Sequence, residues 1–214
     1  MIQTGSIAWT LVRAGLTAAL GATVLGCGFS ERPALVRQTY LLQAKPPTQP
    51  LMTEPRAASL KLSRFVVAAA FGSTALSYRQ TDARYVSDFY FEYFVAPAPM
   101  LTDAATAWLA AAGIFRDVFP PSASPEGDFL LEGFVSELYG DFRDESHPAA
   151  TITAKFFLSD NRSTTGIPIW QREYTQRVAL RDRAPEAVAT GLSAAWTAML
   201  ADLGRDLAAL KLPK

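Results

Sequence analysis

The amino-acid sequence predicts an α+β fold, a two-layer sandwich in which two main helices pack on one face of a mostly antiparallel sheet. Three observations favour this class. Several short segments alternate apolar and polar residues, as strands covered on one face do. Two longer segments carry apolar residues at helical spacing. Between them, three strand-like segments follow one another and include a hairpin loop, which is typical of an antiparallel meander.

The first part of the predicted fold consists of short strands. Residues 43–57 contain four prolines and are expected to form an extended connection between two of them. In the aromatic segment before residue 96, Phe89, Phe91 and Tyr93 alternate and are expected to share one face of a strand. The expected strands in this part cover residues 39–42, 59–67, 75–79 and 85–95.

Two helices are expected. The first follows the strand that ends at residue 95; it opens with prolines, which are tolerated in a first turn, and Gly113 is expected to end it. The second opens near Pro185, ends before Pro213, and presents one continuous apolar stripe. The stripe consists of Val188, Leu192, Ala195, Trp196, Met199, Leu203, Leu207 and Leu210.

The segment between the two helices predicts the antiparallel part of the sheet. Residues 128–138, 150–159 and 167–178 each carry one apolar and one more polar side. Residues 160–166 are rich in Asp, Asn, Ser, Thr and Gly and are expected to form the hairpin loop between the last two strands.

The N-terminal residues have the features of a secretory signal peptide. Arg13 precedes the apolar run 14–25, which is too short to span a bilayer, since spanning takes roughly 20 residues. The run ends in Val24-Leu25-Gly26-Cys27, which resembles the lipobox of bacterial lipoproteins. This resemblance implies cleavage between Gly26 and Cys27 and a lipid attached to Cys27. The alternative is an ordinary leader followed by a chance Cys.

Length and charge complete the predicted organisation. We expect a lipoprotein signal peptide over residues 1–26, a lipidated tether over 27–38 and a single α+β domain over 39–212. The 20 basic and 20 acidic residues balance, so nothing in the charge indicates a nucleic-acid partner. No later apolar stretch is long enough for a second membrane segment.

The sequence contains none of the common catalytic or metal-binding patterns. His147 is the only His and Cys27 the only Cys, so a His/Cys metal site cannot be assembled. There is neither a Gly-x-Ser-x-Gly turn nor a Gly-rich phosphate loop. The loop with Asp141, Asp144, Glu145 and His147 is expected to be a solvated turn, rather than a calcium loop or an acid/base site. We therefore expect a protein without enzymatic activity, with no catalytic residue, no metal and no cofactor other than the lipid on Cys27; a surface-anchored hydrolase is the least favoured alternative.

The order of features resembles the auxiliary lipoproteins of ABC-type transport systems, the family that includes the PqiC-like intermembrane transport lipoproteins. The resemblance covers nearly the whole chain after residue 26. At the position where the family usually has a Trp, shortly before the proline that opens the first helix, this sequence has Phe94, which lacks the indole donor. The segments that carry the resemblance are the lipobox, Tyr40-Leu41-Leu42, Leu76-Ser77-Tyr78-Arg79, the aromatic strand running into Pro97, and a turn at Gly113-Ile114-Phe115-Arg116-Asp117-Val118.

This resemblance implies an accessory subunit without enzymatic activity. Its partners would be an MCE-type substrate-binding protein, a permease and an ATPase, which together move lipid or other hydrophobic solutes across the cell envelope; a homo-oligomer is also possible. Because Gly28, and not Asp, follows Cys27, we expect the outer membrane, with the domain facing the periplasm. The alternative is a structural outer-membrane assembly or envelope-integrity lipoprotein that is unrelated to a transporter.

Tyr78 and Arg79 are the candidate partner contacts. They lie in a short extended segment between loops, and Arg offers a planar fork of donors that suits a protein or a lipid headgroup. The alternative is an edge strand in which Tyr78 is packed and Arg79 is solvated.

Overall fold

The computed structural model describes residues 36–213. The predicted signal peptide, its cleavage site at Gly26 and Cys27, and most of the tether lie outside the described residues. The described strands are β1 (Gln38–Tyr40), β2 (Arg56–Leu62), β3 (Val66–Val67), β4 (Ala75–Arg79), β5 (Tyr85–Tyr93), β6 (Phe115–Phe119), β7 (Phe129–Asp141), β8 (Ala149–Asp160) and β9 (Pro168–Ala179). The helices are the short 3₁₀ turn η1 (Ala69–Phe71), α2 (Pro97–Ala112) and α3 (Pro185–Ala209).

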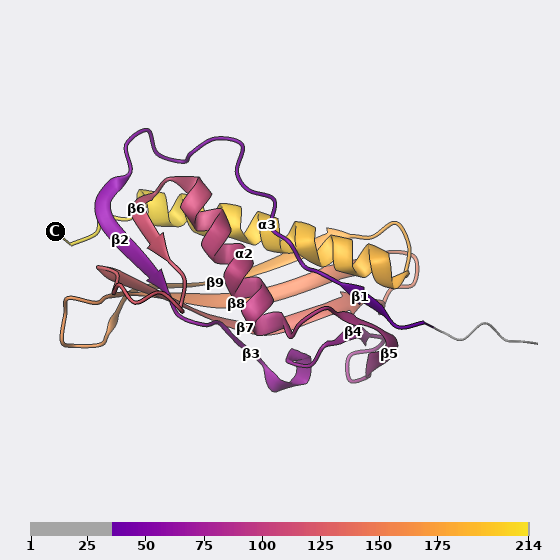
Figure 1. Cartoon of the computed structure of the whole chain (residues 1–214). Coiled ribbons are helices and arrows are strands. Elements are labelled where there is room, and N and C mark those ends of the chain that lie inside the picture. The colour runs from indigo at the N-terminus through magenta and orange to yellow at the C-terminus, as the bar shows by residue number, and fades with distance from the viewer. Residues whose placement is uncertain (1–35, 214) are drawn as a thin grey trace, which may run out of the picture. The chain divides into compact units, whose positions relative to one another are not determined.

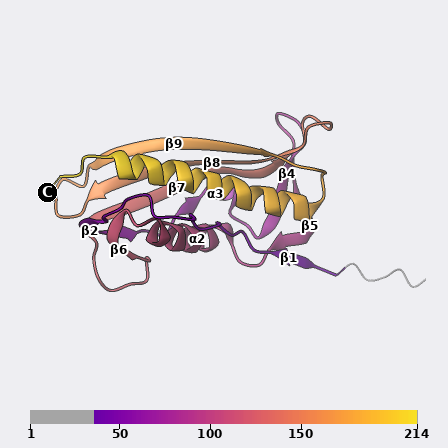
Figure 2. The same cartoon turned by 90° about the horizontal axis from the view of Figure 1, so that it is seen from above.

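The structure confirms the predicted fold class. The nine described strands form one open sheet; α3 packs on one face of β7, β8 and β9, and α2 lies beside α3, against β3 and β6 (Figures 1 and 2). The predicted apolar stripe of α3 faces that sheet: its residues from Val188 to Leu207 are fully buried. Within residues 36–213, no helix lies over the other face of β7–β9 (Figure 2).

The sheet is mixed, and β7 is its centre. The predicted meander is present, since β7 pairs with β8 and β8 with β9, both antiparallel. Along its other edge, β7 pairs in parallel with β2, β3 and β4 in turn. These three short strands reach β7 through long connections and not through hairpins, and such connections permit parallel pairing. The path continues from β4 to β5, antiparallel, and from β5 to β1, parallel.

The predicted turn after the first helix is instead a strand. Gly113 ends α2 in the left-handed conformation (φ 63°), as predicted. The chain then straightens at once into β6, which pairs in parallel with the free edge of β2. Phe115 is buried there and its ring packs against that of Phe129. The apolar residues of the segment from Gly113 to Val118 thus pack into the core, but from a strand and not from a turn.

The proline-rich connection between β1 and β2 runs over the helices. The backbone N–H of Gln43 donates to Oγ of Ser193, and that of Lys45 donates to Oγ1 of Thr197, at 3.2 and 3.0 Å. Both acceptors belong to α3. A segment without secondary structure of its own is thereby fixed to the outside of the helix layer.

Arg56 stabilises the C-terminal end of α3. Its Nη2 donates to backbone carbonyls of the last helical turn, the orphan acceptors at a helix end, where a positive charge is favourable. The acceptors are the carbonyl oxygens of Leu207, Ala208 and Leu210, at 3.2, 2.7 and 2.7 Å.

Within residues 36–213, none of the helices combines the length and apolar character that crossing a membrane requires.

Candidate functional site

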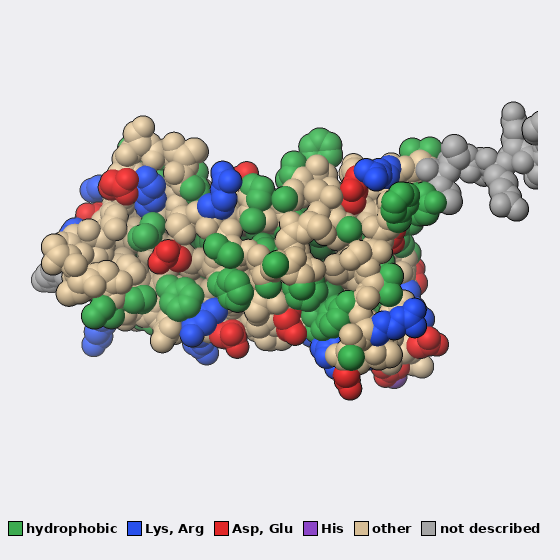
Figure 3. All heavy atoms as spheres, turned by 90° about the horizontal axis from the view of Figure 1, so that it is seen from below, with side chains coloured by type: hydrophobic (Ala, Val, Ile, Leu, Met, Phe, Trp, Pro, Cys, Tyr) green, Lys and Arg blue, Asp and Glu red, His purple; other side chains and the backbone are tan. Residues whose placement is uncertain are grey.

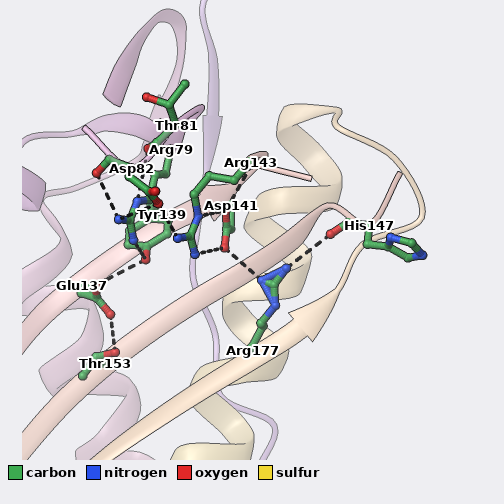
Figure 4. A network of polar contacts seen from close by, with 10 residues as sticks. All are labelled: Arg79, Thr81, Asp82, Glu137, Tyr139, Asp141, Arg143, His147, Thr153 and Arg177. Carbon is green, nitrogen blue, oxygen red and sulfur yellow. Dashed lines mark hydrogen bonds and ion pairs between the residues drawn. The ribbon is translucent and has the colours of Figure 1, made fainter. Parts of the chain in front are cut away.

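A polar hollow of about 620 Å³ lies on the face of the sheet that the helices leave uncovered. It is located at the C-terminal end of β7, between the β4–β5 hairpin on one side and β8 and β9 on the other (Figure 4). Its lining consists of Arg79, Asp82, Glu137, Tyr139, Asp141, Arg143, Asp144, Thr151, Thr175 and Arg177. We call this set the arginine hollow.

Arg79 forms one wall of the arginine hollow. Its Nη1 donates to the hydroxyl of Tyr139 at 3.2 Å, and its guanidinium lies over the rings of Tyr85 and Tyr139, with centroids at 5.4 and 5.8 Å. Its remaining donors reach the carbonyls of Thr81 and Asp82. The side chain is therefore held in one orientation and is only 18% exposed, so Arg79 is not the solvated residue of the edge-strand alternative.

A chain of hydrogen bonds continues from Arg79 along the sheet. Tyr139 donates to Oε1 of Glu137 at 3.3 Å, and Thr153 donates to Oε2 of Glu137 at 2.6 Å. Burial is the main cause that raises the pKa of Tyr139, so its hydroxyl keeps its proton and remains a donor. Glu137 is thus a fixed acceptor between two strands.

Asp141 is the centre of the second half of the arginine hollow. Its nearly buried carboxylate accepts from Nε and Nη2 of Arg143 at 3.0 and 2.9 Å, and from Nη1 of Arg177 at 3.0 Å. Arg143 also reaches the carboxylate of Asp82 at 3.0 Å. Both guanidinium groups remain close to half exposed, so the carboxylate positions two arginines whose outer edges face solvent.

The stability of the protein in acid should depend on Asp141. Hydrogen bonding from Arg143, assisted by the charge of Arg177, holds the pKa of the Asp141 carboxyl below its ordinary value. A carboxyl with a depressed pKa in the folded state contributes stability above its unfolded pKa of about 4, and loses that contribution as the pH falls through its folded pKa. We expect Asp141→Asn to be less stable than the wild type by about 1–3 kcal/mol at neutral pH. Urea unfolding between about pH 7 and pH 3 should show this difference shrinking toward acid; a difference that does not change with pH would contradict the assignment.

Tyr78 points to the opposite face from Arg79. Its ring is buried and stacks on Phe142 with centroids 5.3 Å apart, and its hydroxyl donates to Oδ2 of Asp88 at 2.9 Å. Burial and this hydrogen bond raise the pKa of Tyr78 far above its ordinary range, so it stays a neutral donor. The structure therefore does not bring the two candidate contacts together, and β4 is an interior strand between β5 and β7, not an edge.

The sequence pattern missed most of the arginine hollow. Asp141 was expected in a solvated loop, yet it is the last residue of β7 and is nearly buried. The remaining loop does match the prediction: His147 is mostly exposed and its Nδ1 lies 2.8 Å from the carboxylate of Asp144. The alternation of Glu137, Tyr139 and Asp141, with Arg143 just after the strand, was the available indication of a polar face. Among the residues that the structure describes, no group of three or more His, Cys, Asp or Glu could hold a metal ion.

Comparisons with known proteins define the fold. No protein-family model and no curated protein matches this sequence. The structure is similar to protein XCC0632 from Xanthomonas campestris, of the family DUF330, with a TM-score of 0.69 and 20% identity over 78% of this chain and 92% of that one. It is also similar to an uncharacterised protein, with a TM-score of 0.62 and 16% identity over 80% of this chain and 99% of that one. The described domain thus has the fold of a DUF330 protein.

Proposed function

We propose that this chain is a lipid-anchored accessory protein of the cell envelope that acts by binding another envelope protein and has no enzymatic activity. We propose further that it serves an ABC-type transport system, with an MCE-type substrate-binding protein, a permease and an ATPase, that moves lipid or hydrophobic solutes. The observation that carries the binding role is the arginine hollow, because it presents positioned and still accessible guanidinium groups on an otherwise uncovered sheet. The transporter rests on the resemblance of the motif order to the auxiliary lipoproteins.

The geometry of the arginine hollow suits a protein partner with acidic side chains. Arg143 and Arg177 are 40% and 47% exposed, and Asp141 holds both in place, so little side-chain entropy is lost on binding. Arginine and tyrosine, together with tryptophan, are enriched at the energetic centre of protein interfaces. Arg79 and Tyr139 combine both types in one stacked pair.

Reversing the charge of Arg79 should weaken this interaction. Arg79→Glu would place a carboxylate next to Glu137 and Asp82 and would repel acidic partner groups, so we expect at least a tenfold loss of association, the size of a hot-spot truncation. The measurement is recovery of a cognate MCE-type component, or of a second copy of the chain, during purification from membranes.

A matched charge reversal provides the control for this experiment. Arg116→Glu changes an exposed arginine on β6, which lies away from the arginine hollow at another edge of the sheet, and should leave recovery unchanged. Circular dichroism and thermal melting report folding of both variants. Equal partner recovery with a folded Arg79→Glu protein would remove the arginine hollow from the interface, whereas loss of folding would assign Arg79 a structural role.

We propose the outer membrane as the location, with the domain facing the periplasm. The reason is Gly28: by resemblance to enterobacterial lipoproteins, an Asp in this position would retain the protein at the inner membrane. Density-gradient fractionation should therefore recover the wild type with outer-membrane markers, and Gly28→Asp should shift it to the inner-membrane fraction. A wild-type protein found only with inner-membrane markers would contradict this proposal.

A further inference from the structure

Strand β5 contains a bulge that re-orients an aromatic side chain. On β4, Ala75 pairs with Glu92 and Ser77 pairs with Ser87, so four residues of β5 lie opposite a single residue of β4. Such an insertion bends the strand and changes which face its side chains occupy. The residues in the bulge are Asp88, Phe89, Tyr90 and Phe91.

The bulge is held in place by Asp88. One carboxylate oxygen accepts from the backbone N–H groups of Tyr90 and Phe91, at 2.9 and 3.0 Å, and the other accepts from the buried hydroxyl of Tyr78. These contacts provide partners for backbone groups that the interrupted ladder leaves free. Tyr78 is therefore a positioning residue for the bulge.

The bulge moves Phe89 to the face opposite the one that simple alternation predicts. Strict alternation would place Phe89 with Tyr93, which is buried in the core. Instead, the guanidinium of Arg37 lies 5.8 Å from the centroid of the Phe89 ring and also pairs with Glu92 at 3.4 Å, so Phe89 is next to the charged face of β1 and β5. Its side chain is 72% exposed there.

Other exposed apolar side chains surround the β1–β5 edge. Val36 precedes β1 by two residues, on the strand that pairs in parallel with β5 from Gln38 and Phe91 onward. Leu41 directly follows β1 and Phe94 directly follows β5, and the N–H of Phe94 donates to the carbonyl of Tyr40 at 2.8 Å. Figure 3 shows hydrophobic side chains, with basic and acidic ones between them, at the end of the molecule where the described chain begins. We call the following set the aromatic patch: Val36 (73% exposed), Leu41 (51%), Phe89 (72%), Phe94 (69%) and Val95 (40%).

We propose that the aromatic patch docks on the surface of the lipid bilayer and fixes the orientation of the domain on the membrane. The proposal depends on the proposed lipid anchor. Aromatic side chains flanked by arginine are favoured at the interface between water and hydrocarbon. Arg37 stays 61% exposed: its Nη1 donates to Oε1 of Glu92, whose Oε2 accepts from Thr74, and the rest of the exposed guanidinium can reach a lipid phosphate.

The position of the aromatic patch favours the membrane over a second copy of the chain. Val36 is the first described residue, and the nine residue steps from Cys27 to Val36 reach about 30 Å when fully extended. A lipid on Cys27 therefore keeps this end of the domain near the bilayer at high effective concentration, which makes a weak apolar contact effective.

Site-specific fluorescence can test this contact on the full-length lipidated protein. The chain has a single Cys, which the proposed lipid occupies, so Phe89→Cys and Phe94→Cys each introduce one reactive thiol for an environment-sensitive dye. Ile167→Cys is the matched control: Ile167 is 69% exposed, as is Phe94, but lies in the hairpin between β8 and β9 at the opposite end of β7. The proteins are placed on vesicles of phosphatidylethanolamine and phosphatidylglycerol that contain nitroxide-labelled lipid.

The expected result is quenching by the nitroxide lipid at positions 89 and 94 that is at least threefold stronger than at position 167. Equal quenching at the three positions in a palmitate-labelled protein would overturn the docking proposal and leave the anchor intact. A second result would also overturn the docking proposal: the dyes are shielded from aqueous iodide but are not quenched by the nitroxide lipid, and the shielding disappears when the protein is diluted on the vesicles. That result would assign the aromatic patch to contact with a second copy of the chain. A protein without palmitate would overturn the anchor and, with it, this inference.

Discussion

Replacing Trp196 by Ala is expected to lower the free energy of unfolding by about 3–5 kcal/mol, the usual cost of truncating a buried aromatic side chain. Trp196 is fully buried at the centre of the α3 stripe. Its ring lies 6.2 Å from that of Phe65 and 6.1 Å from that of Phe156, so it joins the helix to two different parts of the sheet layer. Alanine would leave a cavity among these rings that the surrounding strands cannot fill.

The variant Trp196→Phe distinguishes the contribution of the aromatic ring volume from that of the indole N–H. The indole Nε1 of Trp196 has no hydrogen-bond partner among the described residues, so Trp196→Phe loses no such bond and should cost less than half as much as alanine. Urea unfolding of a chain shortened to residues 28–214 measures both variants. A loss below about 1 kcal/mol for Trp196→Ala would show that α3 does not pack on the sheet as described.

Replacing Cys27 by Ser is expected to abolish palmitate incorporation completely. Lipid attachment in bacterial lipoproteins requires the Cys sulfur, and the resemblance of Val24-Leu25-Gly26-Cys27 to a lipobox is the reason we propose Cys27 as the attachment residue. Cleavage follows lipidation in that family, so the variant should also accumulate as an uncleaved precursor. Growth in radiolabelled palmitate, followed by electrophoresis, measures both effects.

A neighbouring substitution is the control for Cys27→Ser. Gly28→Ala changes the next residue without touching the sulfur and should retain both labelling and cleavage. Because the variant keeps the same apolar run, residues 14–25, a general failure of export would affect both proteins equally. Unchanged palmitate incorporation in Cys27→Ser would show that Cys27 does not carry the lipid.

The sequence predicted the local elements well because their patterns are local. Prolines at the start of α2, Gly113 at its end and the stripe of α3 all act within a few turns of one helix. The meander from β7 to β9 was predicted because short connections make antiparallel neighbours. The parallel pairing of β2, β3 and β4 with β7 could not be predicted, because it depends on which free edge each strand meets after a long connection.

The candidate site was predicted only in part. Arg79 was identified from a motif, but its surroundings come from β7 and β9, far along the sequence, so no local spacing reveals that Asp141 lies between two arginines. The position of Phe89 could not be predicted from local spacing either, because the bulge in β5 shifts the alternation of its side chains. Only the pairing of β5 with β4 shows where this shift occurs.

The contact between Arg56 and the end of α3 has a consequence for the order of folding. Arg56 lies near the beginning of the domain and binds carbonyls at residues 207–210, close to its end. Loop-closure entropy makes such distant contacts form late, and a sheet with long-range parallel pairs is slow to assemble. A chain whose last residues are not yet made lacks α3, and the apolar face of β7–β9 is then bare. Completion of the domain must therefore wait for its last residues, and until then the exposed apolar face of the sheet is a natural substrate for chaperones.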